Sequence, residues 1–223
     1  MDMNADSLEE GRTFRCPLWQ QAPADWAAVE AAFAGVPGLP LRQDWREDAE
    51  PGFLGGAARM ARTADALLVA VELEDADVFN PVSAFNEPAF LRGDVVEVFL
   101  LPEGTDRYIE LHTTPDGALF QLRCTVGWRA RCVPGEPLDF RDRLVVSPVT
   151  RVLTRRTAKG WSAYLEIPFG LTEGTPAPGA VWRASVCRYD YTRGREQPVL
   201  SSTSALTKLD FHQTDCWDRL VFV

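Results

Sequence analysis

Apolar and polar side chains alternate in short segments along most of the chain, and glycine and proline separate these segments. The 16 glycines and 16 prolines leave segments of about 6 to 10 residues. This rhythm is typical of the strands of a β-sandwich or barrel. The predicted strands are residues 57–63, 66–74, 94–101, 107–114, 118–124, 144–152, 160–168, 181–191, 199–203 and 219–223.

Two segments favour a helix over a strand. The alanine-rich residues 25–33 predict a short helix with Asp25 as its N-cap. Residues 86–91 predict one helical turn. Helix is therefore expected only in short connections.

The chain shows no internal repeat and no low-complexity linker. Its longest loop-like stretch, residues 35–56, still carries Trp45 and Phe53 as apolar anchors. We therefore predict one all-β domain over residues 1–223. Residues 1–56 are expected to supply an N-terminal strand and a long anchored loop region of that domain.

A predicted hairpin carries the most informative polar residues. Glu97 interrupts an otherwise apolar strand, and the partner strand carries Tyr108, Glu110 and His112 at alternate positions. Alternate side chains share one face of a strand. A carboxylate among apolar neighbours needs a partner or carries a raised pKa. Glu97 is therefore a candidate site residue.

A third strand follows the Pro115–Gly117 turn and carries Gln121 and Arg123 at alternate positions. If the three strands form a meander with their apolar faces inward, six polar side chains gather on one face: Glu97, Tyr108, Glu110, His112, Gln121 and Arg123. Such a face could hydrogen-bond a hydroxyl-rich ligand. The alternative is an ordinary solvated face held by cross-strand ion pairs.

Arg188 and Asp190 share one face of a later strand. They could pair with each other or extend the polar face by pairing with Glu97.

Composition and charge exclude several classes of partner. Hydrophobic residues make up 46% of the chain and charged residues 25%, which predicts a folded globular protein. The net charge of -9 would repel phosphate backbones and anionic lipids, so we expect no nucleic-acid partner. No apolar run reaches the roughly 18 to 20 residues that span a bilayer, so we expect no membrane partner.

The opening residues lack the basic and apolar regions of a signal peptide, which makes the cytoplasm the default expectation. The cysteines are odd in number and show no C-x-x-C spacing, so we predict free thiols. They are Cys16, Cys124, Cys132, Cys187 and Cys216.

The segment LRGDVVEVFL, which carries Glu97, resembles a motif of the family 9 carbohydrate-binding modules and their DOMON-like relatives. The segment GWSAYLEIP resembles a second motif of that family. Order and spacing agree from about residue 57 to the C-terminus. The segments that carry the resemblance are residues 67–78, 91–100, 108–110, 114–117, 160–168, 182–190, 210–212 and 217–222.

This resemblance implies a jelly-roll-like antiparallel β-sandwich and a saccharide partner. Sugar-binding members of the family hold a terminal sugar between two tryptophans and bind its hydroxyls with polar side chains. Glu97 and Glu110 match the carboxylate positions, and His112 stands at the position of the basic residue.

The two tryptophan positions fall near Phe90 or Leu91 and near Ser202, so neither tryptophan is kept. The resemblance also makes a structural calcium ion worth testing, with oxygen ligands from residues 72–77. We expect no other cofactor.

The sequence therefore predicts a non-catalytic carbohydrate-binding domain with eight candidate site residues: Glu97, Tyr108, Glu110, His112, Gln121, Arg123, Arg188 and Asp190. One alternative is a scaffold or partner-binding sandwich without a ligand. A second is a glycoside hydrolase that uses Glu97 and Glu110 as paired carboxylates. A metal site built from His112, His212 and a carboxylate would require their segments to meet in space. The saccharide and the oligomeric state are left open.

Overall fold

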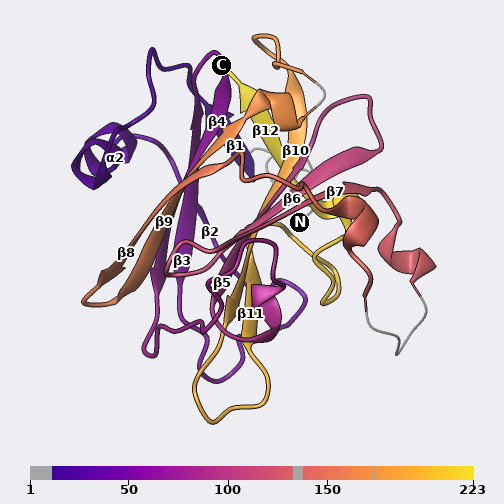
Figure 1. The fold of residues 1–223 in the computed structure, drawn as a ribbon. Helices are drawn as coiled ribbons and strands as arrows, with labels where there is room; N and C mark the ends of the chain where they lie inside the picture. The colour runs from indigo at the N-terminus through magenta and orange to yellow at the C-terminus, as the bar shows by residue number, and fades with distance from the viewer. Residues whose placement is uncertain (1–11, 133–137, 173) are drawn as a thin grey trace, which may run out of the picture.

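The computed structural model describes residues 12–132, 138–172 and 174–223, which form two β-sheets packed face to face (Figure 1). Every strand pair is antiparallel except β1 with β12. The predicted all-β antiparallel sandwich is therefore confirmed. The first 11 residues of the predicted N-terminal region lie outside the described residues.

Within the described residues, the first sheet has the order β1-β12-β10-β5-β6-β7, and β11 also pairs with β10. The second sheet has the order β2-β3-β4-β9-β8. The strands of the first sheet are β1 (Thr13–Cys16), β5 (Val95–Leu101), β6 (Arg107–Thr113), β7 (Leu119–Thr125), β10 (Val181–Asp190), β11 (Val199–Ser202) and β12 (Asp218–Phe222). Those of the second are β2 (Leu39–Pro40), β3 (Gly56–Arg62), β4 (Ala66–Glu74), β8 (Arg151–Thr157) and β9 (Gly160–Pro168).

The main core lies between the two sheets. Apolar side chains at alternate positions of β5 and β6, such as Val98 and Leu111, meet apolar side chains of β4 and β9 there. Trp161 and Trp182 are also buried in this core. The remaining side chains of β5 and β6 therefore point to the outer face of the first sheet.

That outer face is covered rather than solvated. A second apolar cluster packs on it, with Phe99 and Phe120 from the sheet and Trp128 and Trp217 from the connecting segments. The segments that follow β7 and β11 thus form a layer over the sheet. The polar side chains of the outer face lie beneath this layer.

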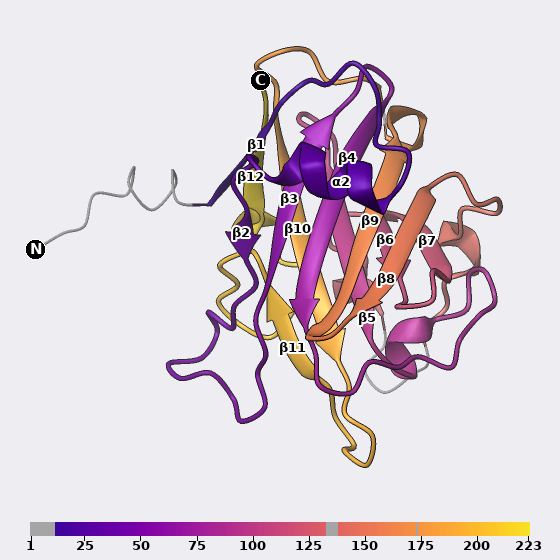
Figure 2. The ribbon, with the colours of Figure 1, turned by 90° about the vertical axis from the view of Figure 1, so that its left-hand side faces the viewer.

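Helix α2 (Trp26–Phe33) begins where the sequence predicts it. Asp25 Oδ1 accepts a hydrogen bond from the Ala28 backbone N–H at 3.0 Å, as an N-cap does. Figure 2 shows α2 lying across the outer face of the second sheet, where Val29 and Phe33 are buried against it. No helix among the described residues is long and apolar enough to span a membrane.

The other helical segments within the described residues are short 3-10 turns: η1 (Ala89–Leu91), η2 (Arg129–Arg131), η3 (Arg141–Arg143), η4 (Phe169–Leu171) and η5 (Thr214–Cys216). The turn η1 lies inside the predicted segment 86–91. All five cysteines are free thiols, as predicted.

The strand predicted at residues 144–152 is wrong. Leu144 makes only an isolated bridge, Val146 is exposed and Pro148 cannot donate to a ladder. The strand begins instead at Arg151, where β8 forms the edge of the second sheet. Edge strands carry mixed polar side chains, so apolar alternation marks them poorly.

Candidate functional site

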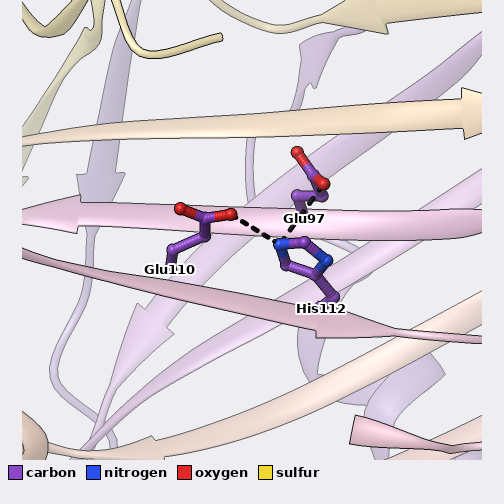
Figure 3. A group of neighbouring side chains, drawn as sticks. All are labelled: Glu97, Glu110 and His112. Atoms are coloured by element: carbon purple, nitrogen blue, oxygen red, sulfur yellow. Dashed lines mark hydrogen bonds and ion pairs between the residues drawn. The ribbon is translucent and has the colours of Figure 1, made fainter. Parts of the chain in front are cut away.

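Two carboxylates and one imidazole form a buried group on the outer face of the first sheet (Figure 3). Glu97 comes from β5, and Glu110 and His112 come from β6. The His112 Nε2 atom lies 2.8 Å from Glu110 Oε1 and 3.3 Å from Glu97 Oε1. These three side chains, called the cavity trio below, are at most 5% exposed.

The β5–β6 register explains why the trio forms. Glu97 lies directly opposite His112, and Glu110 lies opposite Phe99. Glu110 and His112 are two residues apart on one strand, so they share a face. The alternation expected from the sequence is therefore confirmed for these three residues and for Tyr108.

Burial and mutual charge give the members of the trio different proton affinities. Burial, together with the negative charge of Glu110, raises the pKa of Glu97 to about 7, although His112 opposes this shift. Burial also raises the pKa of Glu110, but the hydrogen bond and charge of His112 outweigh it and leave that pKa below its usual value. Burial lowers the pKa of His112, yet Glu97 and Glu110 raise it above its ordinary value. Glu97 is thus the carboxylate that takes up a proton first as pH falls.

A second hydrogen-bonded chain lies beside the trio. Trp128 Nε1–H donates to the Tyr108 hydroxyl at 2.5 Å, and this hydroxyl lies 2.7 Å from His212 Nδ1. Burial raises the pKa of Tyr108 far above its usual range, so the hydroxyl keeps its proton. Because its oxygen already accepts from Trp128, we assign the O–H as the donor to His212 Nδ1. Burial also lowers the pKa of His212, which favours the neutral ring. His212 Nε2 then carries the ring proton and can donate to a bound molecule.

A cavity of about 520 Å³ opens over these groups. Glu97, Glu110 and His212 line it, and His112 contacts both of these carboxylates. The aromatic lining consists of Phe90, Phe140, Tyr189 and Phe211, and the charged residues Arg129, Lys208 and Asp210 complete the polar lining. The cavity therefore combines hydrogen-bonding groups with several aromatic rings.

No protein-family model matches the chain, and neither does any curated protein. The solved structures that match the chain include three that cover almost its whole length. A proposed carbohydrate-binding protein from Bacteroides uniformis has 19% identity and a TM-score of 0.73, with 95% of this chain and 99% of that chain covered. A family 9 carbohydrate-binding module from Caldicellulosiruptor kristjanssonii in complex with cellotriose has 11% identity and a TM-score of 0.64, with coverage of 95% and 93%.

A module of the same family and organism in complex with glucose has 10% identity and a TM-score of 0.64, with coverage of 94% and 95%. The chain has a fold like that of family 9 carbohydrate-binding modules. At these identities the likeness concerns the fold alone, so the function of this family 9-like domain has to be argued from its own side chains.

The expected position of Gln121 and Arg123 is wrong. In the β6–β7 register His112 lies opposite Phe120, whereas Gln121 lies opposite Leu111 and faces the other side of the sheet. Gln121 there donates to the Ser147 backbone carbonyl at 3.1 Å. The prediction failed because it took every apolar face to point inward, whereas the outer face of this sheet is also apolar.

Arg188 and Asp190 lie on the opposite face of the first sheet from the trio. Cys187 is the residue paired with Glu97, so its neighbour Arg188 points to the other side. Arg188 forms ion pairs at 3.1 Å with Asp190 and with Asp75. The expected pairing of Arg188 with Asp190 is confirmed, and Arg188 takes no part in binding Glu97.

Asp94 joins this second group, and Asp75, Asp94, Asp190 and Arg188 are called the inner acidic cluster below. Its three carboxylates have ligand atoms within 4.8 Å of one another. Calcium takes 6–8 oxygen ligands, whereas here a guanidinium already bonds Asp75 and Asp190, and backbone N–H groups occupy both oxygens of Asp94. This position does not fit a calcium ion, and the calcium prediction itself stays untested.

The trio could also be considered as a metal site, because its ligand atoms lie within 4.8 Å of one another. However, His112 Nδ1 is buried and has no hydrogen-bond partner among the described residues. The Nε2 atom already lies 2.8 Å from Glu110 and 3.3 Å from Glu97, so a metal ion on Nε2 would have to displace both contacts, and no described residue accepts a hydrogen bond from Nδ1 to orient the ring. The arrangement therefore favours hydrogen bonding to an organic ligand over metal ligation.

Several cavity residues escaped the sequence prediction. Phe140 and Phe211 lie in irregular segments, where no periodicity marks which way a side chain points. Tyr189 could have been found, because it lies two residues after Cys187, the residue paired with Glu97. His212 was considered only as a metal ligand, and its hydrogen bond to Tyr108 depends on contacts between distant segments.

Proposed function

We propose that this protein is a non-catalytic carbohydrate-binding domain that holds a saccharide in the cavity over Glu97 and Glu110. The observation that carries the proposal is a buried carboxylate open to the cavity. Glu97 Oε1 faces His112, whereas Glu97 Oε2 has no hydrogen-bond partner among the described residues and Glu97 lines the cavity. A ligand hydroxyl is a suitable donor to that oxygen.

The other cavity groups support the same ligand class. His212 Nε2–H can donate to a ring or hydroxyl oxygen, and Glu110 adds a second acceptor. Sugars alternate hydroxyl groups with apolar C–H faces, and aromatic rings bind such faces. Phe90, Phe140 and Tyr189 present such rings to the cavity.

Phe90 lies near one of the two positions where the family 9 resemblance implies a tryptophan. It lines the cavity, whereas its neighbour Leu91 is exposed and Ser202 is fully buried. An aromatic ring is thus kept at one of the two expected positions. We infer that Phe140, Tyr189 or Phe211 replaces the second.

The trio's geometry favours binding over glycoside hydrolysis. A glycosidase places its two carboxyl groups on either side of the scissile bond, about 5 to 9.5 Å apart. Here Glu97 and Glu110 come from adjacent strands and face the same imidazole nitrogen, at 3.3 and 2.8 Å. Two carboxylates on one wall suit a pair of ligand hydroxyls better than an acid and a nucleophile.

Calorimetric titration with glucose and cellotriose tests the proposal. We expect saturable binding, and Glu97→Gln should weaken it by about 10- to 100-fold, because a charge-assisted hydrogen bond becomes a neutral one. Glu72→Gln is the matched control, since Glu72 is an exposed carboxylate paired with Arg59 on the other sheet. The proposal fails if a broader panel of mono- and oligosaccharides gives no binding, or if Glu97→Gln and Glu72→Gln bind equally well.

A further inference from the structure

The ionised cavity trio is short of one positive charge. Glu97 and Glu110 each contribute a carboxylate, and His112 supplies one imidazolium at most. Full ionisation therefore leaves one net negative charge at the floor of a cavity, where burial makes such a charge costly. A proton on Glu97 can neutralise this charge, since burial raises the pKa of Glu97 to about 7, and a bound cation would take the place of that proton.

The groups packed around the trio do not supply the missing charge. Burial raises the pKa of Cys124, Cys187 and Tyr189, so these side chains stay neutral. Burial lowers the pKa of His212, which also favours its neutral form. Neither β7 nor β10 therefore places a buried cation against the carboxylates.

The two cationic side chains that line the cavity are exposed to water. Lys208 pairs with Asp210 at 3.4 Å, and Arg129 lies over the Trp128 ring at 5.4 Å. Water and salt screen such exposed charges much more than buried ones. Burial has the largest effect on the pKa of Glu97 and of Glu110. The charge of Arg129 opposes burial with the smallest effect in each case, so Arg129 compensates the charge at the cavity floor only in part.

We propose that the preferred ligand is an amino sugar, whose protonated amine binds between Glu97 and Glu110 while its hydroxyls and ring occupy the rest of the cavity. This inference rests on the proposed function and names its substrate class. Glu97 and Glu110 both line the cavity, and Glu97 Oε2 has no hydrogen-bond partner among the described residues, which leaves it able to accept from an ammonium group. An ammonium group offers three N–H donors, so it can bond both carboxylates at once.

The aromatic lining also suits a cation. The Phe90 ring lies 5.5 Å from the His112 ring and 5.7 Å from the Tyr189 ring. Phe90 and Tyr189 also line the cavity, and a ligand ammonium within about 6 Å of such a ring would be attracted to its π face. A neutral hydroxyl at the same place gains neither this interaction nor the compensation of charge.

Three trisaccharides that share one β-1,4-linked backbone and differ in the group at C2 test whether the charge of that group matters. Cellotriose carries a hydroxyl at C2 of each sugar, the glucosamine trimer carries an amine that can bind in its protonated form, and the N-acetylglucosamine trimer carries a neutral amide. Titration calorimetry of the full chain at neutral pH should show the glucosamine trimer binding about tenfold or more tighter than cellotriose. The N-acetylglucosamine trimer should bind no better than cellotriose, because it lacks the charge.

The variants test the same preference without depending on absolute affinity. In Glu97→Gln and in Glu110→Gln the ratio of the two affinities should fall towards one, whereas Glu72→Gln should keep it. Circular dichroism confirms that each variant is folded. Saccharide binding without a preference for the amine, or with an unchanged preference in both glutamate variants, overturns this inference and leaves the proposed function standing. Failure of all three trisaccharides together with a wider panel of sugars overturns both.

Discussion

The cavity trio and the inner acidic cluster are both buried and rich in carboxylates, and they lie on opposite faces of the same sheet. In the inner cluster, backbone N–H groups of Phe79 and Tyr191 bond the two oxygens of Asp94, and Arg188 bonds Asp75 and Asp190. In the trio, by contrast, one oxygen of Glu97 lacks a partner among the described residues and its side chain lines a cavity.

This difference separates two uses of a buried charge. A carboxylate whose oxygens all have partners in its own chain holds segments together, as Asp94 does for the segments before β5 and after β10. A carboxylate with a free acceptor at a cavity keeps capacity for a ligand. Counting acidic residues does not distinguish these cases, whereas following each oxygen to its partner does.

Breaking the inner cluster should have the largest effect. Arg188→Gln removes the guanidinium and leaves Asp75 and Asp190 without their cation, at a cost of about 3 to 5 kcal/mol in unfolding free energy. Chemical denaturation of the variant and the wild type measures the loss. Arg59→Gln is the control, because its pair with the exposed Glu72 contributes under about 1 kcal/mol. Equal losses in the two variants would show that the inner cluster does not stabilise the fold as described.

The pH dependence of stability should contain a contribution from each group, and variants separate the two contributions. Burial raises the pKa of both Glu97 and Asp94 to about 7, from 4.5 and 3.8 respectively. A raised pKa means that the folded state holds the proton more tightly, so stability is fully present below the unfolded pKa and is lost as pH rises through about 7. The raised pKa of His112 acts in the same direction.

Urea denaturation at several pH values between about 4 and 8 measures this slope. Glu97→Gln should flatten it by roughly 1 to 3 kcal/mol across the window, because the variant cannot ionise at that position. Asp94→Asn should flatten it through the other group. A wild-type slope retained in Glu97→Gln would contradict the raised pKa of this carboxylate.

The sequence predicts the strands of the central sheets well, because both β5 and β9 alternate or run apolar over their whole length. It also predicts the trio. Glu97 interrupts an apolar strand, and Glu110 and His112 are two residues apart on the next strand, so they share one face of it. The alternation of side chains between the two faces of a strand is a local property, so the sequence of a single strand reveals it.

Contacts between distant segments cannot be predicted from the alternation of side chains within one strand. The sequence gives no sign that Trp128 and Phe140 cover the outer face, and without that cover Phe120 was expected to point inward. Gln121 was placed with the trio for this reason. The cavity walls come from the same covering segments, so most of them were missed as well.

The smallest expected effect concerns one of these walls and sharpens the division between ligand binding and folding. Phe140 lines the cavity and packs edge-on against Phe120, with ring centroids 5.2 Å apart. Phe140→Leu keeps an apolar side chain but removes the ring that a sugar face would contact, so saccharide affinity should fall by about 0.5 to 1.5 kcal/mol. Unfolding free energy should change by less than about 1.5 kcal/mol, since the swap conserves most of the apolar volume.

Val146→Ala is the control, because Val146 is exposed and does not line the cavity. Titration calorimetry and urea denaturation on the same preparations separate the two quantities, and a variant that loses stability but binds saccharide as tightly as the wild type would assign Phe140 to folding alone.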